Sequence, residues 1–270
     1  MRIFANETLR TVREGITAGE LRDDFRPGAD LIVVNGFPTE QATVLRDGDR
    51  VVLIRRGEAP AREELEALMA ARHTPGVHER MRSSRVGIAG LGGLGSAAAM
   101  ALARMGVGEL VLADFDVVEP SNLNRQHYLV EDIGLEKTAA MSRRLASVNP
   151  CIRVITHPVV LDEGNIGRVF DGVDVLLECF DRAEAKAMII RAAADLLPGT
   201  FLVGASGVAG YGESNSIRTI RLGDRVYMVG DMVSAAEPGR GLMAPRVGIA
   251  AHHQANLAVS LLIHGEDATL

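Results

Sequence analysis

Short apolar runs alternate with longer amphipathic segments along residues 85–205. The runs have the length of strands, and the segments between them repeat apolar residues at helical spacing. Because helical segments alternate with these runs, the pattern predicts an α/β fold with a doubly wound, mostly parallel sheet. The predicted strands are Val86–Ala89, Leu110–Ala113, Ile152–His157, Val173–Glu178 and Phe201–Gly204.

The segments between these strands predict four helices. One follows the glycines at 90–95, and the others cover Lys137–Val148, Glu163–Phe170 and Ala183–Leu196, with Asp162 as a cap for the third. After a glycine-rich crossing at 205–212 the pattern changes. Two short runs, 217–221 and 226–229, predict a hairpin, and residues 244–264 predict a final helix.

Residues 1–57 have a different pattern, with short runs separated by turn residues. We expect strands at 2–4, 9–12, 31–34, 42–45 and 50–54, and a helix at 18–24 capped by Thr17. This order predicts a small open sheet wrapped on one helix. Residues 58–76 predict a linker helix that starts near Pro60. The expected domains are therefore 1–57 and 77–270, joined by the linker.

Composition narrows the classes of function. The net charge of −6, the absence of Trp and the three Tyr argue against nucleic acid as a partner. Polar residues interrupt the apolar stretch at 244–263, so no membrane span is expected. The two cysteines, Cys151 and Cys179, lie far apart and form no CxxC pair. A zinc site made of four cysteines is therefore excluded, and a cytoplasmic location is expected.

The strongest chemical motif is G-x-G-x-x-G between the first predicted strand and its helix. Its residues are Gly90, Gly92, Gly93 and Gly95. Glycines allow a tight turn and close approach of the backbone to phosphate, and the helix N-terminus offers free N–H groups. This arrangement is Rossmann-like. The motif by itself leaves a dinucleotide and ATP as alternatives.

An acidic residue follows the second predicted strand. Asp114 lies about 20 positions beyond the glycines, where an acid accepts hydrogen bonds from ribose hydroxyls. The alternative interpretations are a helix cap or a surface acid. Asp116 is a second candidate for the same contact.

Further polar residues follow two of the strands. Arg125 and Lys137 are cations that we expect to converge on phosphates. Asp181, just beyond the fourth strand, is a candidate ligand for Mg²⁺, which takes one or two carboxylates together with phosphate oxygens. A helix cap is the alternative role for Asp181. The tract before Arg125 consists of Ser121, Asn122, Leu123 and Asn124.

These motifs together resemble the ThiF, MoeB and HesA family of ubiquitin-activating-like adenylating enzymes, on the ThiF side. The resemblance covers about residues 72–265 and rests on the glycine motif, D-F-D-V-V-E-P-S-N-L-N-R-Q, Lys137, E-C-F-D and G-L-M-A-P. It implies ATP and Mg²⁺ as cofactors, with Gly93, Asp114, residues 121–125, Lys137 and Asp181 at the nucleotide. It also implies a homodimer in which Arg72 reaches the partner's site.

The activity implied by this resemblance is adenylation of the terminal glycine of a small carrier. A sulfur donor protein would then convert the acyl-adenylate into a thiocarboxylate. The expected carrier is ThiS-like and serves thiazole synthesis for thiamine. The alternatives are a molybdopterin-type carrier, an NAD-dependent oxidoreductase and a non-catalytic carrier-binding scaffold.

Residues 1–57 resemble a ThiS-type sulfur carrier with the ubiquitin-like β-grasp fold. Such carriers end in a free Gly-Gly, whereas this segment continues through Arg55-Arg56-Gly57-Glu58. The carrier chemistry is therefore missing, and we expect a docking or dimer-packing role. The zinc-binding CxxC pairs of many relatives are also absent, so no zinc is expected. Cys179 is expected to be a buried, inert thiol, and no carrier thioester is expected.

Overall fold

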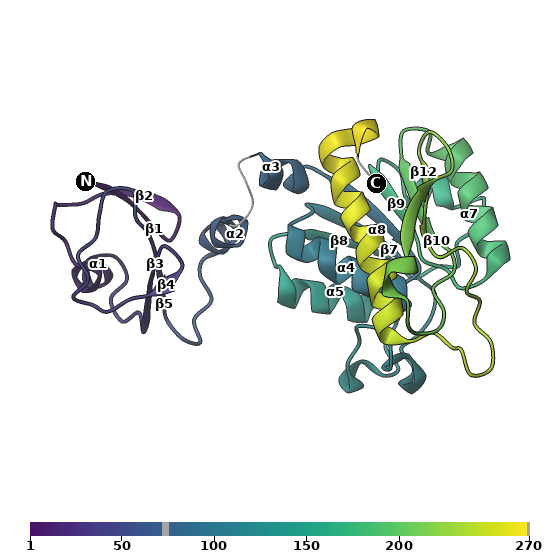
Figure 1. Cartoon of the computed structure of the whole chain (residues 1–270), viewed down its shortest axis with the longest axis horizontal. Coiled ribbons are helices and arrows are strands. Elements are labelled where there is room, and N and C mark those ends of the chain that lie inside the picture. Colours follow the sequence, from purple (N-terminus) through teal and green to yellow (C-terminus); the bar gives the residue numbers. More distant parts are fainter. Residues whose placement is uncertain (72–75, 269–270) are drawn as a thin grey trace. The chain divides into compact units, whose positions relative to one another are not determined.

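The computed structural model describes residues 1–71 and 76–268. It divides into two compact units, residues 1–74 and 75–270 (Figure 1). Each unit has its own hydrophobic core.

The first unit is a five-stranded sheet packed on one helix. The sheet has the order β2-β1-β5-β3-β4, in which β1 and β5 are parallel and the other pairs antiparallel. One face packs against α1 through Ile3, Ile32, Val51 and Leu53, all buried. The elements are β1 (Arg2–Ala5), β2 (Thr8–Thr11), α1 (Ala18–Phe25), β3 (Leu31–Val34), β4 (Phe37–Pro38) and β5 (Arg50–Ile54).

Helix α1 begins where the sequence predicted. Glu20 N–H donates to the Thr17 hydroxyl and Thr17 N–H donates to Glu20, which forms a complete capping box. The strand predicted at 42–45 is wrong. In this segment Val44 forms one isolated bridge with Thr17, and Leu45 is buried in the core. The apolar run therefore reflects core packing, and the fourth strand is instead the short β4 after Asn35-Gly36.

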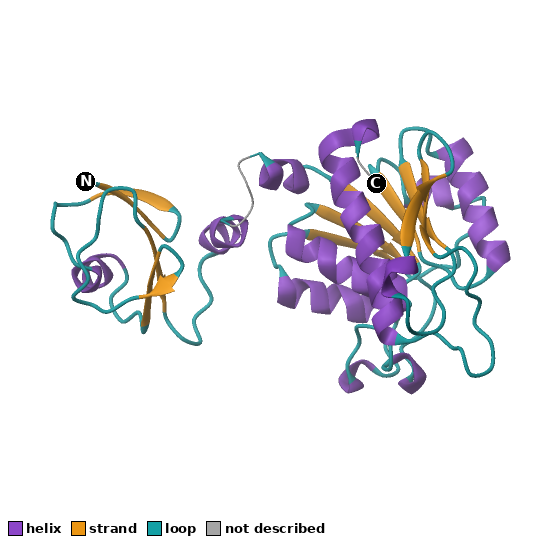
Figure 2. Cartoon of the chain, in the orientation of Figure 1, coloured by secondary structure: helices purple, strands orange, loops and turns teal. Residues whose placement is uncertain are grey.

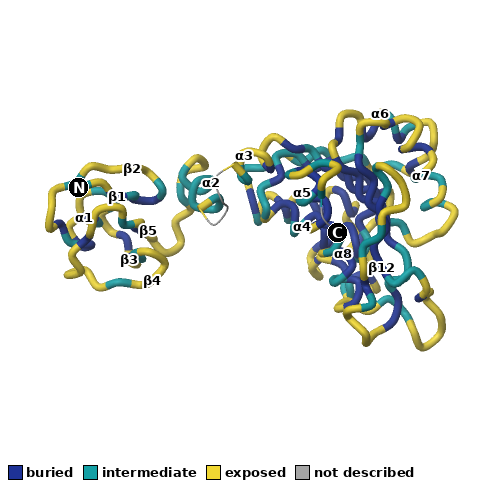
Figure 3. The backbone as a smooth tube through the Cα atoms, turned by 45° about the horizontal axis from the view of Figure 1, so that its top comes forward, coloured by how far each residue is buried: buried dark blue, intermediate teal, exposed yellow. Residues whose placement is uncertain are grey.

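Helix α2 (Arg62–Ala70) lies within the predicted linker, and no residue of α2 is buried. Figure 3 shows it in the colours of intermediate and exposed residues. The predicted domain limits 1–57, 58–76 and 77–270 remain predictions.

The second unit contains a seven-stranded sheet in the order β11-β12-β10-β9-β6-β7-β8. All neighbours are parallel except the edge strand β11, which pairs antiparallel with β12 as the hairpin pattern predicted. The strands are β6 (Arg85–Ala89), β7 (Glu109–Ala113), β8 (Arg153–His157), β9 (Val175–Glu178), β10 (Phe201–Ala205), β11 (Arg218–Arg221) and β12 (Val226–Gly230).

Helices cover both faces of this sheet (Figure 2). One core cluster joins the sheet to α4, α5 and α8, and a second joins the opposite face to α6 and α7. The doubly wound, Rossmann-like prediction is confirmed. The helices are α3 (Val77–Arg82), α4 (Gly93–Met105), α5 (Lys137–Val148), α6 (Ile166–Val169), α7 (Ala183–Leu196) and α8 (Ala244–His264), with short 3₁₀ turns at 120–122, 130–132, 214–216 and 265–267.

The structure differs from the sequence prediction at two helices, α6 and α3. Helix α6 is a single turn of four residues, shorter than the predicted 163–170, because Asp162 and Asn165 first form their own turn. Helix α3 was not predicted from the sequence. Helix α8 has the predicted bounds, and among the described residues no helix is long and apolar enough to cross a membrane.

Candidate nucleotide-binding site

The predicted site residues gather at the carboxyl ends of the central strands. Ala89, the last residue of β6, pairs with both Ala113 of β7 and Glu178 of β9. Because these ends are in register, the glycine turn, Asp114 and the turn before Asp181 all begin at one edge. The strand order reverses between β6 and β9, and open α/β sheets bind ligands at such a point.

The glycine turn packs too closely for side chains at three positions, one of which is Gly93, whose Cβ would lie 2.8 Å from Val247 Cγ1. Gly90 has φ +92°, and a Cβ there would lie 3.0 Å from the carbonyl oxygen of Cys179. A Cβ on Gly95 would overlap the carbonyl oxygen of Gly90. Gly92 precedes α4 without any side-chain cap, so the first N–H groups of the helix remain available. This cradle fits a phosphate group.

Two side chains hold the glycine turn through the backbone of Leu91. Leu91 N–H donates to Asp114 Oδ2 at 2.6 Å, and the Tyr128 hydroxyl donates to the Leu91 carbonyl oxygen at 2.9 Å. Burial raises the pKa of Asp114, while the Leu91 N–H and the nearby Lys137 oppose the rise. A carboxylate offers about four lone-pair positions. Asp114 therefore keeps capacity for a ribose hydroxyl besides the bonds from Leu91 and Asp116.

The first candidate cation lies directly against the glycine turn. Arg125 Cγ would be 3.6 Å from a Cβ on Gly93. Arg125 Nη1 donates to the Ser121 carbonyl oxygen and to Asn124 Oδ1, at 3.2 and 2.8 Å. These bonds orient the exposed guanidinium of an arginine whose stem packs against the glycine turn.

The second candidate cation begins α5. The Lys137 side chain is 7% exposed, and its Nζ donates to Asp116 Oδ2 at 2.7 Å. Asp116 N–H in turn donates to Asp114 Oδ1 at 2.8 Å. Asp116, a second candidate from the sequence, therefore links the ribose candidate to the phosphate candidate.

Hydrogen bonds within the tract before Arg125 fix the backbone conformation of this tract. Glu119 N–H donates to Asn122 Oδ1, and the Asn122 carbonyl oxygen accepts from the N–H groups of Arg125 and Gln126. Asn122 is buried, Leu123 is half-buried, and Ser121 and Asn124 are exposed.

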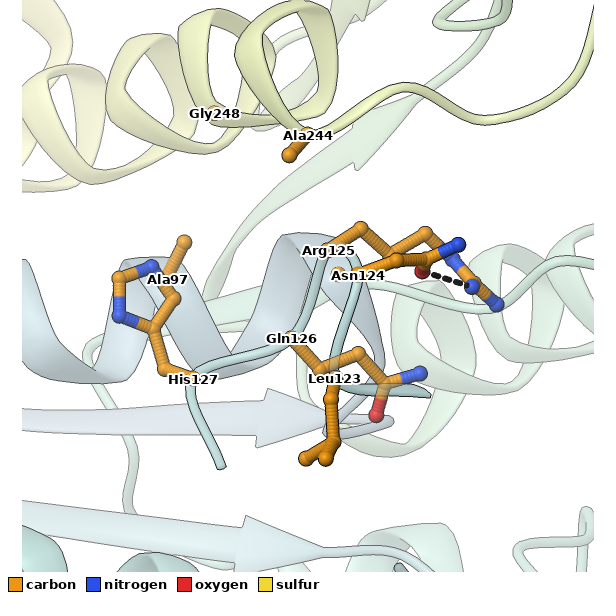
Figure 4. A pocket seen from close by; sticks show the side chains of 9 residues that line it. Ala97, Leu123, Asn124, Arg125, Gln126, His127, Ala244 and Gly248 are labelled. Carbon is orange, nitrogen blue, oxygen red and sulfur yellow. Dashed lines mark hydrogen bonds between the residues drawn. The ribbon is translucent and has the colours of Figure 1, made fainter. Parts of the chain in front are cut away.

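A cavity of about 200 Å³ lies beside this tract (Figure 4). It opens between the first turns of α4 and α8 and is lined by Gly93, Ala97, Leu123, Asn124, Arg125, Gln126, His127, Ala244 and Gly248. Gln126 is 7% exposed, and its Oε1 has no hydrogen-bond partner among the described residues. A buried unpaired polar atom beside an open cradle favours a ligand-binding role.

Asp181 lies in the turn between β9 and α7 and is exposed. It does not cap α7, because the N-cap position is Arg182 and has no side-chain cap bond. Within residues 1–71 and 76–268, no group of three or more His, Cys, Asp or Glu side chains is arranged to hold a metal ion. One free carboxylate at this edge fits Mg²⁺ only with phosphate oxygens and water as further ligands.

The structure thus brings together the glycines, Asp114, Arg125, Lys137 and the turn that carries Asp181. Arg72, the predicted partner-site arginine, lies outside the described residues. Sequence reasoning missed two contacts of this region: the bond from Tyr128 to the Leu91 carbonyl oxygen, and the ion pair of Lys186 with Glu178. Cys179 is 7% exposed, as predicted, and burial raises the pKa of its thiol.

Comparison with known protein families identifies both units of the chain. Residues 66–268 match the model of the ThiF family, and residues 1–57 match that of ThiS-like ubiquitin domains. The chain therefore belongs to the ThiF family, and its N-terminal unit is a ThiS-like domain. Both the family resemblance and the predicted fold class are confirmed.

Curated relatives include activating enzymes of small modifiers. Ubiquitin-like modifier-activating enzyme 5 of Drosophila melanogaster is 35% identical over 159 residues, which are 54% of this chain and 39% of that protein. The adenylyltransferase and sulfurtransferase UBA4 of Yarrowia lipolytica is 33% identical over 187 residues, 67% of this chain and 46% of that protein. The chain spans less than half the length of these relatives.

Solved structures share the fold. The E. coli tRNA N6-threonylcarbamoyladenosine dehydratase TcdA, in complex with AMP, superposes with a TM-score of 0.65 at 21% identity. The match covers 72% of this chain and 92% of that one. E. coli MccB with AMPCPP and MccA gives a TM-score of 0.55 at 22% identity, covering 69% and 58% of the two chains.

Proposed function

We propose that this protein uses ATP and Mg²⁺ to adenylate the C-terminal glycine carboxylate of a small ubiquitin-like carrier. The observation that carries this proposal is the meeting of an uncapped glycine turn, Asp114, Arg125 and Lys137 at the point where the strand order reverses. A dehydrogenase site needs the glycines and the acid but has no use for two cations at the phosphates.

The reaction requires charge neutralisation rather than a general base. A terminal carboxylate has a pKa of roughly 3.5 and is already ionised at neutral pH. One carboxylate oxygen attacks the α-phosphorus, the bond from that phosphorus to the bridging oxygen breaks, and pyrophosphate leaves. The N–H groups of α4, Arg125 and Lys137 hold the phosphates and stabilise the charge on them. Mg²⁺ at Asp181 would neutralise further phosphate charge when bound.

The proposed substrate is a ThiS-like sulfur carrier that serves thiazole synthesis for thiamine. Two observations support a carrier of this class: the ThiS-like domain within the chain, and the similarity to a ubiquitin-like modifier-activating enzyme and to an adenylyltransferase and sulfurtransferase. A separate protein would supply sulfur to the acyl-adenylate. We also propose that the enzyme acts as a homodimer in the cytoplasm.

The deciding experiment is carrier-dependent exchange of labelled pyrophosphate into ATP. Purified ThiS-like and molybdopterin-type carriers are offered separately, each beside a version that lacks the terminal Gly-Gly. Exchange with the intact ThiS-like carrier supports the proposal, and exchange with the other carrier alone reassigns the substrate. NAD binding without exchange contradicts adenylation, and carrier binding without exchange indicates a scaffold.

A further inference from the structure

An ion pair with a fully buried carboxylate and a partly buried lysine lies next to the turn that carries Asp181. Glu178, the last residue of β9, is 0% exposed, and Lys186 in the first turns of α7 donates to its Oε1 at 2.9 Å. The same Oε1 accepts from Phe180 N–H at 2.7 Å. Phe180 immediately precedes Asp181, so the carboxylate fixes the backbone on which the candidate metal ligand is carried.

The pair also binds the next strand. Lys186 Nζ donates to the carbonyl oxygen of Ala205 at 2.9 Å, and Ala205 N–H donates weakly to Glu178 Oε2 at 3.4 Å. Ala205 ends β10, where the glycine-rich crossing begins. From α8, Gln254 donates to the carbonyl oxygens of Glu178 and Val203, at 3.0 and 3.1 Å. Four elements therefore meet at one polar cluster.

The choice of lysine at this position is informative. Lys137 and Lys186 are the only lysines in a sequence with 29 basic residues, and both lie at the candidate site's edge of the sheet. An ammonium is a compact point charge on a flexible stem, so it reaches Glu178 and the Ala205 carbonyl at once. The planar guanidinium of Arg does not reproduce this geometry in the same space.

A buried ion pair is costly to desolvate, and replacing it with apolar residues often does not destabilise a protein. Packing alone therefore does not account for Glu178 and Lys186. We propose that they form a positioning pair that holds the Asp181 turn in the geometry needed for Mg²⁺ bound to ATP. This inference rests on the proposed function, which identifies the nucleotide as ATP. It concerns how Mg²⁺ changes the affinity for that nucleotide, and not the rate of the adenylation reaction.

The test measures the affinity of the full chain for a non-hydrolysable ATP analogue over a range of Mg²⁺ concentrations. The variants are Glu178→Gln, Lys186→Arg and the double variant Glu178→Gln/Lys186→Met, which leaves no unpaired buried charge. Glu109→Gln is the matched control, because Glu109 pairs with Arg85 and Arg153 at the opposite, amino-terminal edge of the sheet. Melting temperature is recorded for each protein.

We expect each variant of the pair to need about 10- to 100-fold more Mg²⁺ for half-maximal enhancement of binding, as for other residues that orient metal ligands. Affinity without Mg²⁺ and the behaviour of Glu109→Gln should remain near wild type. A double variant that melts like wild type but has lost Mg²⁺ affinity supports positioning over simple stability.

A folded double variant with wild-type Mg²⁺ dependence overturns the inference, as does a wild type whose nucleotide affinity ignores Mg²⁺. Pyrophosphate exchange is measured in parallel. Exchange by the wild type with unchanged Mg²⁺ dependence in the variants rejects only the positioning pair. If the variants lose the Mg²⁺ dependence of nucleotide binding but the wild type shows no pyrophosphate exchange, only the proposed function is rejected.

Discussion

Lys137 Nζ lies 2.7 Å from Asp116 Oδ2, although the lysine side chain is 7% exposed and the aspartate side chain 47% exposed. The backbone N–H of Lys137 also donates to the Asp116 carbonyl oxygen at 2.9 Å. The buried stem and these two bonds hold the ammonium at the strand ends. Asp116 therefore keeps a cation in place that would otherwise be drawn into solvent, at a point where phosphate can compete for it.

Replacing Lys137 tests this cation. Lys137→Met keeps the apolar stem and removes the charge, so we expect kcat/KM for pyrophosphate exchange to fall about 100- to 1,000-fold. The melting temperature should change little, because the partner Asp116 is half exposed to water. Arg153→Met, at the opposite edge of the sheet, is the control and should exchange like wild type. Equal activity of the two variants would contradict the role of Lys137.

The glycine turn allows folding and binding to be separated. A Cβ on Gly95 would overlap the Gly90 carbonyl, so Gly95→Ala should destabilise the second unit by about 3 kcal/mol or more. A Cβ on Gly92 would meet nothing closer than Gln126 Nε2 at 3.9 Å, and its φ of −72° suits any residue.

Gly92→Ala should therefore fold normally yet bind ATP about tenfold more weakly, because its methyl group occupies space beside the phosphates. Urea denaturation and nucleotide titration of both variants check these expectations. Unchanged ATP affinity in Gly92→Ala would place the phosphates elsewhere.

A second buried ion pair should give stability a measurable pH dependence. Asp231 accepts from Arg246 Nη2 at 2.6 Å and from the N–H groups of Val233 and Ser234. Burial disfavours its ionised form, but the bonds from Ser234, Val233 and Arg246 prevail and lower the pKa of Asp231 to about 2.

Because the folded pKa lies below the unfolded value of about 3.9, this stabilisation is complete above that value and disappears as the pH falls toward 2. Asp231→Asn should cost about 3 kcal/mol at pH 7 by leaving Arg246 buried without its partner charge. The difference in unfolding free energy between the two proteins should shrink below pH 4. A difference that stays constant with pH would contradict the assignment.

The cysteines give a test of covalent chemistry. Cys179 is buried, and its thiol donates to Gln254 Oε1 at 3.8 Å. Burial raises its pKa, so little reactive thiolate is present at neutral pH. A Cys151→Ala/Cys179→Ala variant should retain pyrophosphate exchange within about threefold of wild type. A carrier conjugate that forms on the wild type with ATP, is cleaved by excess thiol and is lost in this variant would reopen a thioester step.

Much of the fold could be predicted because the spacing of apolar positions within each segment indicates whether it forms a strand or a helix. The period of apolar positions located β6 to β10 and the final helix, and Thr17 marked the start of α1. Predictions failed where burial arises from distant contacts. Leu45 is apolar because it completes the core of the first unit, and without neighbouring strands in view this run is indistinguishable from a strand.

The sequence by itself determined which residues carry charge or flexibility: the glycines, Asp114, Arg125, Lys137 and Asp181. It also determined that the glycine turn, Asp114 and Asp181 come shortly after strands. Only the tertiary structure decided that β6 and β9 are neighbours, since strand order depends on long-range packing and not on local pattern. The pairing of β9 with β10, which the sequence also leaves open, brings Glu178 to Ala205 and Lys186 next to the turn that carries Asp181.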